Sequence, residues 1–270
     1  MTFSSQRVTA VLAKELAELK SNMAALVPVV ILAVVTVVLP FVIVIILPAA
    51  LGEPLSTDAD FRRLATRTGG PAGEELSGEG GVQAFLFQQF LFVQLMIPVA
   101  GAMSFAGHSL IGEKQTRSLE PLLASPITTL ELLIAKGLGA LVPSLIILFC
   151  ASGIFFGGIA VFAQPGVLDV VLNARSALVV FALGPAASLV ALQVGVLVSS
   201  RVNDPRTAQQ YSAFLILPLT ALFAVQFTGA VMMTVPFVLL LLVIMLGIWA
   251  LLVAVGVVLF DRETILTRWR

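Results

Sequence analysis

The chain is poor in charged residues and in the residue types that build metal sites or disulfide frameworks. Of its 270 residues, 11% are charged, one is a cysteine (Cys150) and one is a histidine (His108). One residue of each kind excludes a disulfide framework and a metal site built from several His or Cys ligands. The formal net charge of zero gives no indication of nucleic-acid binding. We therefore expect neither a bound metal nor a nucleic-acid partner.

Catalytic motifs are absent as well. The sequence has no G-x-x-x-x-G-K-[ST] phosphate loop, so we do not expect the chain itself to hydrolyse ATP. No arrangement of paired carboxylates, Ser with His, or H-E-x-x-H favours an intramembrane enzyme. No apolar run has a carboxylate near its middle, which disfavours a proton- or sodium-coupled carrier. We predict a chain that is not an enzyme and holds no cofactor of its own.

The residues that are abundant are apolar. Hydrophobic residues make up 59% of the chain and the mean hydropathy is +1.08, far above the values of soluble domains. Only helices or closed barrels can span a bilayer, because every backbone amide in lipid needs an internal partner. Barrel strands alternate apolar and polar residues, whereas the runs here are continuous and roughly 20 or more residues long. The sequence predicts an all-α membrane protein.

The apolar runs predict six spans in one transmembrane domain, residues 1–270. With the N-terminus inside, 11 of the 15 Lys and Arg residues fall in inner segments, as is typical of cytoplasmic loops. We therefore expect a multi-pass protein of the cell membrane with both termini in the cytoplasm. The first apolar run is about twice as long as a signal-peptide core, so we interpret it as a retained span. The predicted segments are an amphipathic interfacial helix at 1–23, spans at 24–50, 83–111, 129–163, 174–199, 211–228 and 235–260, an extracytoplasmic loop at 51–82, a short cytoplasmic helix within 112–127 and a cytoplasmic tail at 261–270.

The N-terminal segment has an apolar helical face that contains one carboxylate. At about 100° per residue, Glu15 lies in the middle of this face. An unpaired charge facing hydrocarbon costs about 2.5–3.5 kcal/mol even on lenient scales. We therefore expect Glu15 to meet a cation from another segment. The apolar members of the face are Val8, Val11, Leu12, Leu16, Leu19 and Met23.

Charge is concentrated between the second and third spans. Within the window 112–137, Thr128 and Glu131 form a T-x-x-E capping box that predicts the start of the third span. The short helix before it has a leucine stripe. This stripe could rest on the bilayer or on neighbouring spans, or it could dock a soluble partner. The charged residues of the window are Glu113, Lys114, Arg117, Glu120, Glu131 and Lys136.

The stretch GEKQTRSLEPLLASPITTLELLIAKGLGAL resembles the signature of the type-2 ATP-binding-cassette (ABC) transporter permeases. That signature is G-E-[RK]-x-x-[GR]-[ST]-L-E-x-L-L-x-[ST]-P, followed by E-x-[LI]-x-x-K. The N-terminal A-x-x-x-K-E-L, the stretch SSRVNDPRTAQQ and the closing LFDRETILTRWR are also similar to that family, so the resemblance covers nearly the whole chain. The matching residues of the signature are Gly112, Glu113, Lys114, Ser118, Leu119, Glu120, Leu122, Leu123, Ser125, Pro126, Glu131 and Lys136.

The resemblance implies partners and a mechanism. Such permeases pair with a second copy or a sister permease and bind two ABC ATPase subunits, which hold ATP and Mg. Membrane lipid and an accessory extracytoplasmic protein are further candidate partners. The helix within 112–127 would be the coupling helix in a cleft of the ATPase, and the loop between spans four and five would form a second contact. The implied coupling residues are Gly112, Glu113, Lys114, Arg117, Leu119, Glu120, Leu122, Leu123, Asp204 and Arg206.

Polar residues within spans provide candidates for a substrate path. Gln88, Gln89 and Gln94 of span two are candidate path-lining residues. The alternative is that their side-chain amides form hydrogen bonds between packed helices. We expect His108 to be an interfacial hydrogen-bonding residue rather than a ligand. Gly153 and Gly157, in the stretch GIFFG, predict close packing within the chain, with a seam between two copies as the alternative.

Taken together, the sequence predicts the transmembrane subunit of an ATP-driven exporter of a lipid, a peptide or an amphipathic compound. Two other classes stay open. One is a membrane platform that transports nothing and relays the work of an ATPase, and the other is a secondary carrier or channel. Apolar walls with a few amides suit all three kinds of cargo, so the sequence does not identify the substrate.

Overall fold

The computed structural model describes residues 4–68, 76, 78–116, 128–201, 210, 217–226, 228 and 234–259. Throughout these residues the regular structure is helical, with no strand. Five helical stretches are long and apolar enough to cross a membrane, which confirms the all-α membrane class. These stretches are Met23–Leu51, Glu79–Ser109, Glu131–Phe162, Ala174–Ser199 and Val235–Gly256.

A shorter apolar helix, Leu217–Gln226, covers part of the predicted fifth span, 211–228. The remainder of that span lies largely outside the described residues. Six spans therefore stay a prediction.

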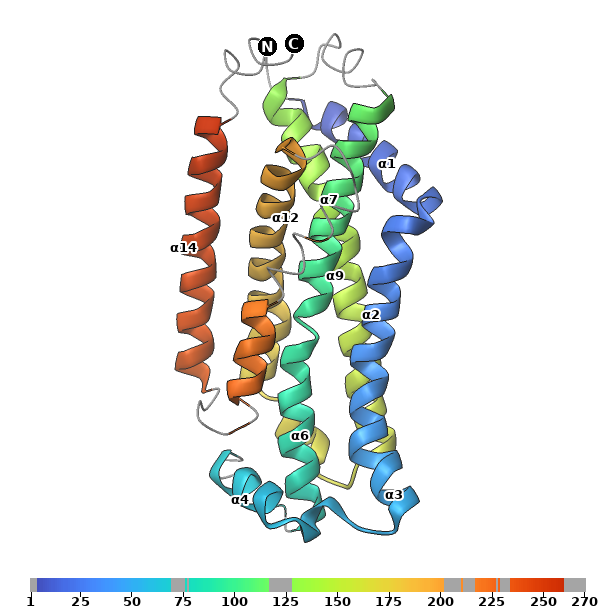
Figure 1. Ribbon diagram of the computed structural model, residues 1–270, viewed down its shortest axis with the longest axis vertical. Helices are drawn as coiled ribbons and strands as arrows, with labels where there is room; N and C mark the ends of the chain where they lie inside the picture. Colours follow the sequence, from blue (N-terminus) through green and yellow to red (C-terminus); the bar gives the residue numbers. More distant parts are fainter. Residues whose placement is uncertain are drawn as a thin grey trace.

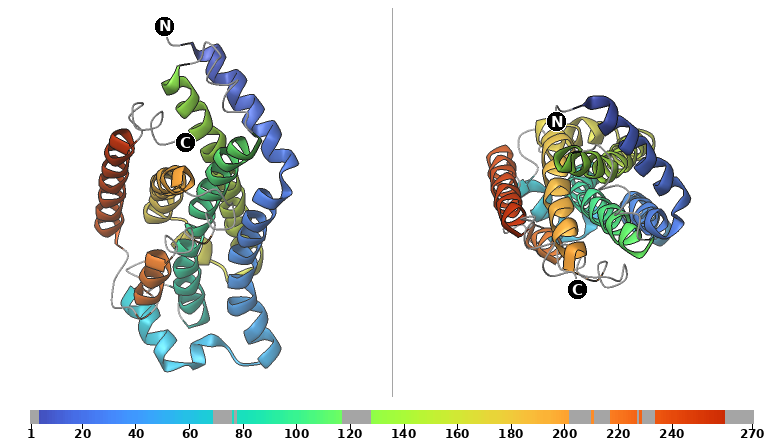
Figure 2. Two further views of the ribbon diagram at one scale, coloured as in Figure 1. Left: turned by 45° about the horizontal axis from the view of Figure 1, so that its top comes forward. Right: turned by 90° about the horizontal axis from the view of Figure 1, so that it is seen from above.

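The second membrane stretch forms the centre of the bundle. It consists of α6 (Glu79–Val93) and α7 (Met96–Thr116), and 78% of its most apolar window is buried. Around it lie α2 (Met23–Phe41), α9 (Thr129–Phe162) and α12 (Gly184–Arg201), as Figures 1 and 2 show. The last membrane helix, α14 (Val235–Leu259), stands at the edge with 6% of its window buried. Its exposed apolar surface is available to lipid or to another chain.

The bundle has two ends, which are named here by a helix at each. At the α1 end lie α1 (Ser5–Ser21), the last turns of α7 and α12, and the first turns of α9 (Figure 1). At the α4 end lie α3 (Leu47–Leu51), η2 (Leu55–Thr57), α4 (Ala59–Thr68) and the first turn of α6. α10 (Val167–Val171) also packs on α6. Asp58 caps α4 by accepting the Asp60 N–H at 2.8 Å.

Proline disturbs three of the membrane stretches in ways that helix length alone does not predict. The second stretch breaks between α6 and α7, where the Ile97 N–H bonds the Gln94 carbonyl. Pro98 lacks the N–H that would continue the α-helical ladder to this carbonyl. The first and fourth stretches each widen into a π-helical turn shortly before a proline, η1 (Val42–Ile46) before Pro48 and η3 (Val179–Leu183) before Pro185. A wider turn relieves the clash between a proline ring and the carbonyl four residues earlier. Between η3 and the loop that precedes it lies α11 (Ala174–Leu178).

Glycine determines where the helices approach most closely, and here one prediction is wrong. Among the described residues nothing lies within 4 Å of a Cβ built at Gly153 or Gly157, so these glycines do not pack against the described part of the chain. The face of α9 that packs carries Gly158 instead, where a Cβ would lie 2.5 Å from the Phe41 ring of α2. The seam between two copies stays open for Gly153 and Gly157.

Candidate functional site

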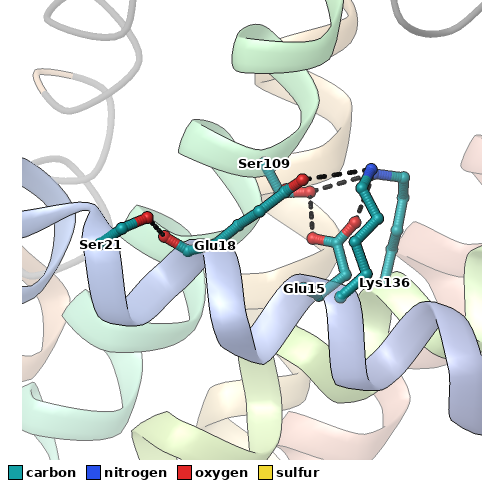
Figure 3. A network of polar contacts seen from close by, with 6 residues as sticks. Glu15, Glu18, Ser21, Ser109 and Lys136 are labelled. Atoms are coloured by element: carbon teal, nitrogen blue, oxygen red, sulfur yellow. Dashed lines mark hydrogen bonds and ion pairs between the residues drawn. The ribbon is translucent and has the colours of Figure 1, made fainter.

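The α1 end contains a buried polar cluster formed by three helices. The Lys136 ammonium of α9 lies 3.0 Å from Oε1 of Glu15 on α1, and both side chains are less than 10% exposed. The Ser109 hydroxyl of α7 donates to Oε2 of Glu15 at 2.7 Å and accepts from Lys136 Nζ at 3.0 Å. Figure 3 shows the three side chains converging from their helices. The predicted cationic partner of Glu15 is thereby confirmed and identified as Lys136.

The close approach of α1 to α9 depends on a glycine. A Cβ built at Gly139 would lie 2.9 Å from the Glu15 Cβ, closer than carbon atoms pack without a shift. With only hydrogen at Gly139, the Glu15 carboxylate reaches the lysine one turn earlier on α9. The pair is then hydrogen-bonded as well as charge-matched, which is the condition for a buried ion pair to be tolerated.

A second polar contact joins the beginnings of the same two helices. Glu131 closes the predicted capping box of α9, because its carboxylate accepts the Thr128 N–H at 2.8 Å and the Thr128 side chain accepts the Glu131 N–H. The same carboxylate accepts the N–H of Ser4, the residue just before α1, at 2.6 Å and lies 3.5 Å from the Arg7 guanidinium. One side chain therefore caps α9 and also holds the start of α1.

Apolar packing fills the space between the two polar contacts. Val8 and Val11 of α1 form a buried cluster with Leu132 and Ala135 of α9. The amphipathic face expected of the N-terminal segment is thus turned towards α9 over this part of its length. Met23, the last residue predicted on that face, instead begins α2 and is exposed. The Asn22 side chain caps α2 by accepting the Ala25 N–H at 3.2 Å, which ends α1 one residue earlier.

The polar cluster consists of Glu15, Ser109 and Lys136. Two of its members flank the predicted coupling segment in the sequence, with Ser109 before it and Lys136 after it. Ser109 belongs to α7, which runs five residues beyond the predicted limit of span two and ends at Thr116. Lys136 belongs to α9, which begins at Thr129. The chain between these helices is the stretch that resembles the coupling helix. α1 is therefore bonded to the helix before this stretch and to the helix after it.

The structure describes few of the predicted coupling residues themselves. Gly112 is partly buried in the penultimate turn of α7 and lines a hollow beside the polar cluster. Glu113 and Lys114 belong to the same helix, but their side chains lie outside the described residues. The remaining coupling residues, Arg117, Leu119, Glu120, Leu122, Leu123, Asp204 and Arg206, also lie outside the described residues, so their role stays a prediction.

The hollow beside the polar cluster has a volume of about 220 Å³. Its lining includes Glu18, Asn22 and His108 in addition to the cluster. His108 Nδ1 lies 2.9 Å from the Ser104 carbonyl, and because a carbonyl can only accept, this nitrogen is the donor. The histidine thus bonds within its own helix, in agreement with the predicted hydrogen-bonding role. No group of His, Cys, Asp and Glu that could hold a metal occurs among the described residues.

The candidate path-lining glutamines of the second span are all buried and only partly bonded. Gln88 donates to the Val170 carbonyl at 2.9 Å, and Gln94 accepts from the Ser152 hydroxyl at 2.8 Å. These two contacts are hydrogen bonds from side-chain amides to packed neighbouring elements, which is the alternative that the sequence left open. Gln89 Oε1 and Gln94 Nε2 have no hydrogen-bond partner in the described part of the chain. A path along these amides stays a prediction.

Sequence reasoning did not find all the residues of this junction. Ser109 and Gly139 had no distinguishing signal, because a serine near the end of a span and a glycine in a glycine-containing helix are both common. Lys136 matched the family signature, and its position five residues after Glu131 in an otherwise apolar helix start was an available indication of a buried partner. Ser4 contributes only its backbone N–H, which no sequence pattern reports.

The apolar helices, the central buried stretch and the polar cluster that joins α1 to α7 and α9 define a helical multi-pass membrane protein. The family comparison makes this class specific, because residues 62–248 match the family described as "ABC-2 family transporter protein". The match covers more than half of the chain, which therefore belongs to the ABC-2 transporter family and is a permease subunit of an ABC transporter. Neither the curated proteins nor the solved structures gave a match.

Proposed function

We propose that this permease is the membrane subunit of an ATP-driven exporter whose energy comes from separate ABC ATPase subunits. Family membership supports an ATPase partner in general. The sequence supports a separate chain for hydrolysis, because it contains no phosphate-binding loop. In this proposal two ATPase subunits hold ATP and Mg, and the permease acts as a homodimer or beside a sister permease in the cell membrane, with both termini in the cytoplasm.

The observation that carries the proposal is the polar cluster at the α1 end. Glu15 contacts Ser109 before the coupling segment and Lys136 after it. A displacement of the segment by an ATPase would act on both helices and, through α1, on the first span. Buried, hydrogen-bonded contacts transmit such a displacement better than exposed ones, since they have a single well-defined arrangement.

The test is a comparison of coupling-segment variants in purified complexes. The tagged chain is isolated from its native membranes, and ATP hydrolysis by the co-purifying complex is measured. Replacing Leu122 and Leu123 together by alanine should release the ATPase or uncouple its hydrolysis from transport, while the permease stays inserted. Glu113→Ala should act in the same direction.

A matched control is available on α14. Leu239 and Leu240 are exposed apolar residues far along the chain from the coupling segment. Their replacement by alanine should leave ATPase association and hydrolysis unchanged. Association and coupled hydrolysis that survive the changes at Glu113, Leu122 and Leu123 would refute the assignment of this segment. Transport by vesicles that contain both subunits distinguishes the exporter from a platform, which would move nothing.

A further inference from the structure

The α4 end contains a second hollow, which none of the roles above uses. It has a volume of about 390 Å³ and is a groove between the end of the first span, the start of the second and the end of the third. Val44 and Ile45 of the π-helical turn η1 form part of one wall, and Phe162 of α9 forms part of another. π-helical turns inside α-helices are frequent at functional sites. The wide turn here shapes the wall of a groove.

The lining contributed by α6 is polar, whereas most of the lining from the first span is apolar. Glu79 and Gln83, one turn apart at the start of α6, both line the groove. Glu79 accepts the N–H groups of Leu55 and Ser56 at 3.3 and 2.8 Å, which leaves lone pairs on both carboxylate oxygens. Among the described residues that line the groove, Glu79 is the one that carries a charge. The Glu79 side of the groove therefore attracts a cation.

Gln83 adds a hydrogen-bond donor beside this carboxylate. The residue is 94% buried, and its Oε1 accepts the Gln164 N–H at 3.0 Å. Its Nε2 has no hydrogen-bond partner in the described part of the chain. An amide N–H₂ that lines a groove and has no partner within the described residues favours a ligand with an acceptor oxygen.

The apolar surface around the groove indicates how a ligand would reach it. Phe162 is 65% exposed, and on the first span Ile46 and Leu47 are also exposed. In a bilayer these side chains face acyl chains, so the groove is open to molecules dissolved in the membrane. A carboxylate and an amide donor side by side complement a group that carries a cation next to an anionic oxygen.

We propose that this groove binds the head of a phospholipid with a primary amine, with its ammonium on Glu79, its phosphate on Gln83 Nε2 and its acyl chains along the exposed surface of span one. Such zwitterionic heads place an ammonium a few bonds from a phosphate, which suits two side chains one helical turn apart. As export cargo this lipid rests on the proposed function, whereas its binding does not.

The test uses native mass spectrometry of the purified full chain, offered equal amounts of phosphatidylethanolamine, phosphatidylcholine and phosphatidylglycerol. The wild-type chain should retain the ethanolamine lipid about tenfold over the other two, because a hydrogen bond to a charged group reaches that factor. Free phosphoethanolamine, which lacks acyl chains, should not displace it at equal concentration. Equal retention of the three lipids would overturn the proposal without recourse to any variant.

Variants locate the site. Glu79→Gln, which keeps an acceptor for Ser56, and Gln83→Met should each reduce retention of the ethanolamine lipid about tenfold. Asp169→Asn is the matched control, since Asp169 is an exposed carboxylate on α10 that does not line the groove. Wild-type retention in both groove variants, or an equal loss in the control, would contradict the assignment. The isolated chain needs no ATPase, so a chain that binds this lipid and recruits no ATPase would refute the proposed function alone.

Discussion

Lys136 on α9 and Glu15 on α1 are 121 residues apart in the sequence, and their charged groups lie 3.0 Å apart in a buried position. Their ion pair is shared with Ser109 of α7. The pair does more than neutralise two charges at the edge of a membrane. It joins the amphipathic helix to the two membrane helices that flank the predicted coupling segment.

Removing one member of the pair should cost more than reversing both. Glu15→Gln or Lys136→Met should each lower stability by about 3–5 kcal/mol, because the remaining charge is left buried and unmatched. The double variant Glu15→Lys with Lys136→Glu should recover most of this loss, since the Ser109 hydroxyl can donate or accept in either arrangement. Thermal unfolding in detergent measures the differences.

Glu18 provides the control for this comparison. It lies on the same helix, with its side chain 55% exposed and 3.3 Å from Lys14. Exposed pairs contribute about 0–1 kcal/mol, so Glu18→Gln should barely change the unfolding midpoint. The single reversals Glu15→Lys and Lys136→Glu complete the comparison, and a double variant that loses as much stability as the sum of these two would contradict a direct interaction between Glu15 and Lys136.

Two glycines of α9 should respond in opposite ways to the same substitution. Gly139→Ala places a Cβ 2.9 Å from the Glu15 Cβ, so α1 must shift and stability should fall by about 1–3 kcal/mol. Gly153→Ala meets nothing within 4 Å among the described residues. It should therefore raise the stability of the monomer by up to about 1 kcal/mol through helix propensity. The unfolding midpoints of the two variants report the contrast, and equal effects would contradict the close packing of α1 on α9.

Glu131 should hold the beginning of α1 as well as the beginning of α9. Glu131→Ala removes the bonds from Ser4, Arg7 and Thr128, whereas Thr128→Ala removes only the cap on α9. Loss of a cap costs about 1 kcal/mol. Hydrogen exchange should therefore accelerate at residues 5–11 in the Glu131 variant and stay near wild type there in the Thr128 variant. Unchanged exchange at residues 5–11 in both variants would show that Glu131 does not anchor α1.

Much of this fold could be predicted because its signals are local. Continuous apolar runs located the membrane helices, and the T-x-x-E box located the start of α9 at Thr129. The helical period showed that Glu15 lies on an apolar face, and the cost of an unpaired charge there required a cation. Which cation was not predictable, because that choice depends on how helices more than 100 residues apart pack.

Other features depend on packing alone and were missed or misassigned. Pro98 was visible in the sequence, but whether it bends, widens or breaks a membrane helix depends on the groups that can bond the freed carbonyl. Gly153 and Gly157 have the spacing of a packing motif, yet the orientation of α9 turns them away from the other described residues. The groove at the α4 end combines Glu79 and Gln83 with Phe162, residues that no single motif connects.

The most direct test of the coupling mechanism is a photo-cross-link from the predicted coupling segment. A photoreactive amino acid at position 123 of the tagged chain, activated in native membranes, should capture an ABC ATPase subunit identified by its mass, and the same group at position 239 on α14 should not. The cross-link at position 123 should weaken when ATP is trapped in the ATPase if the two proteins shift against each other during hydrolysis. Capture of lipid alone at position 123, with no ATPase at either position, would contradict the account.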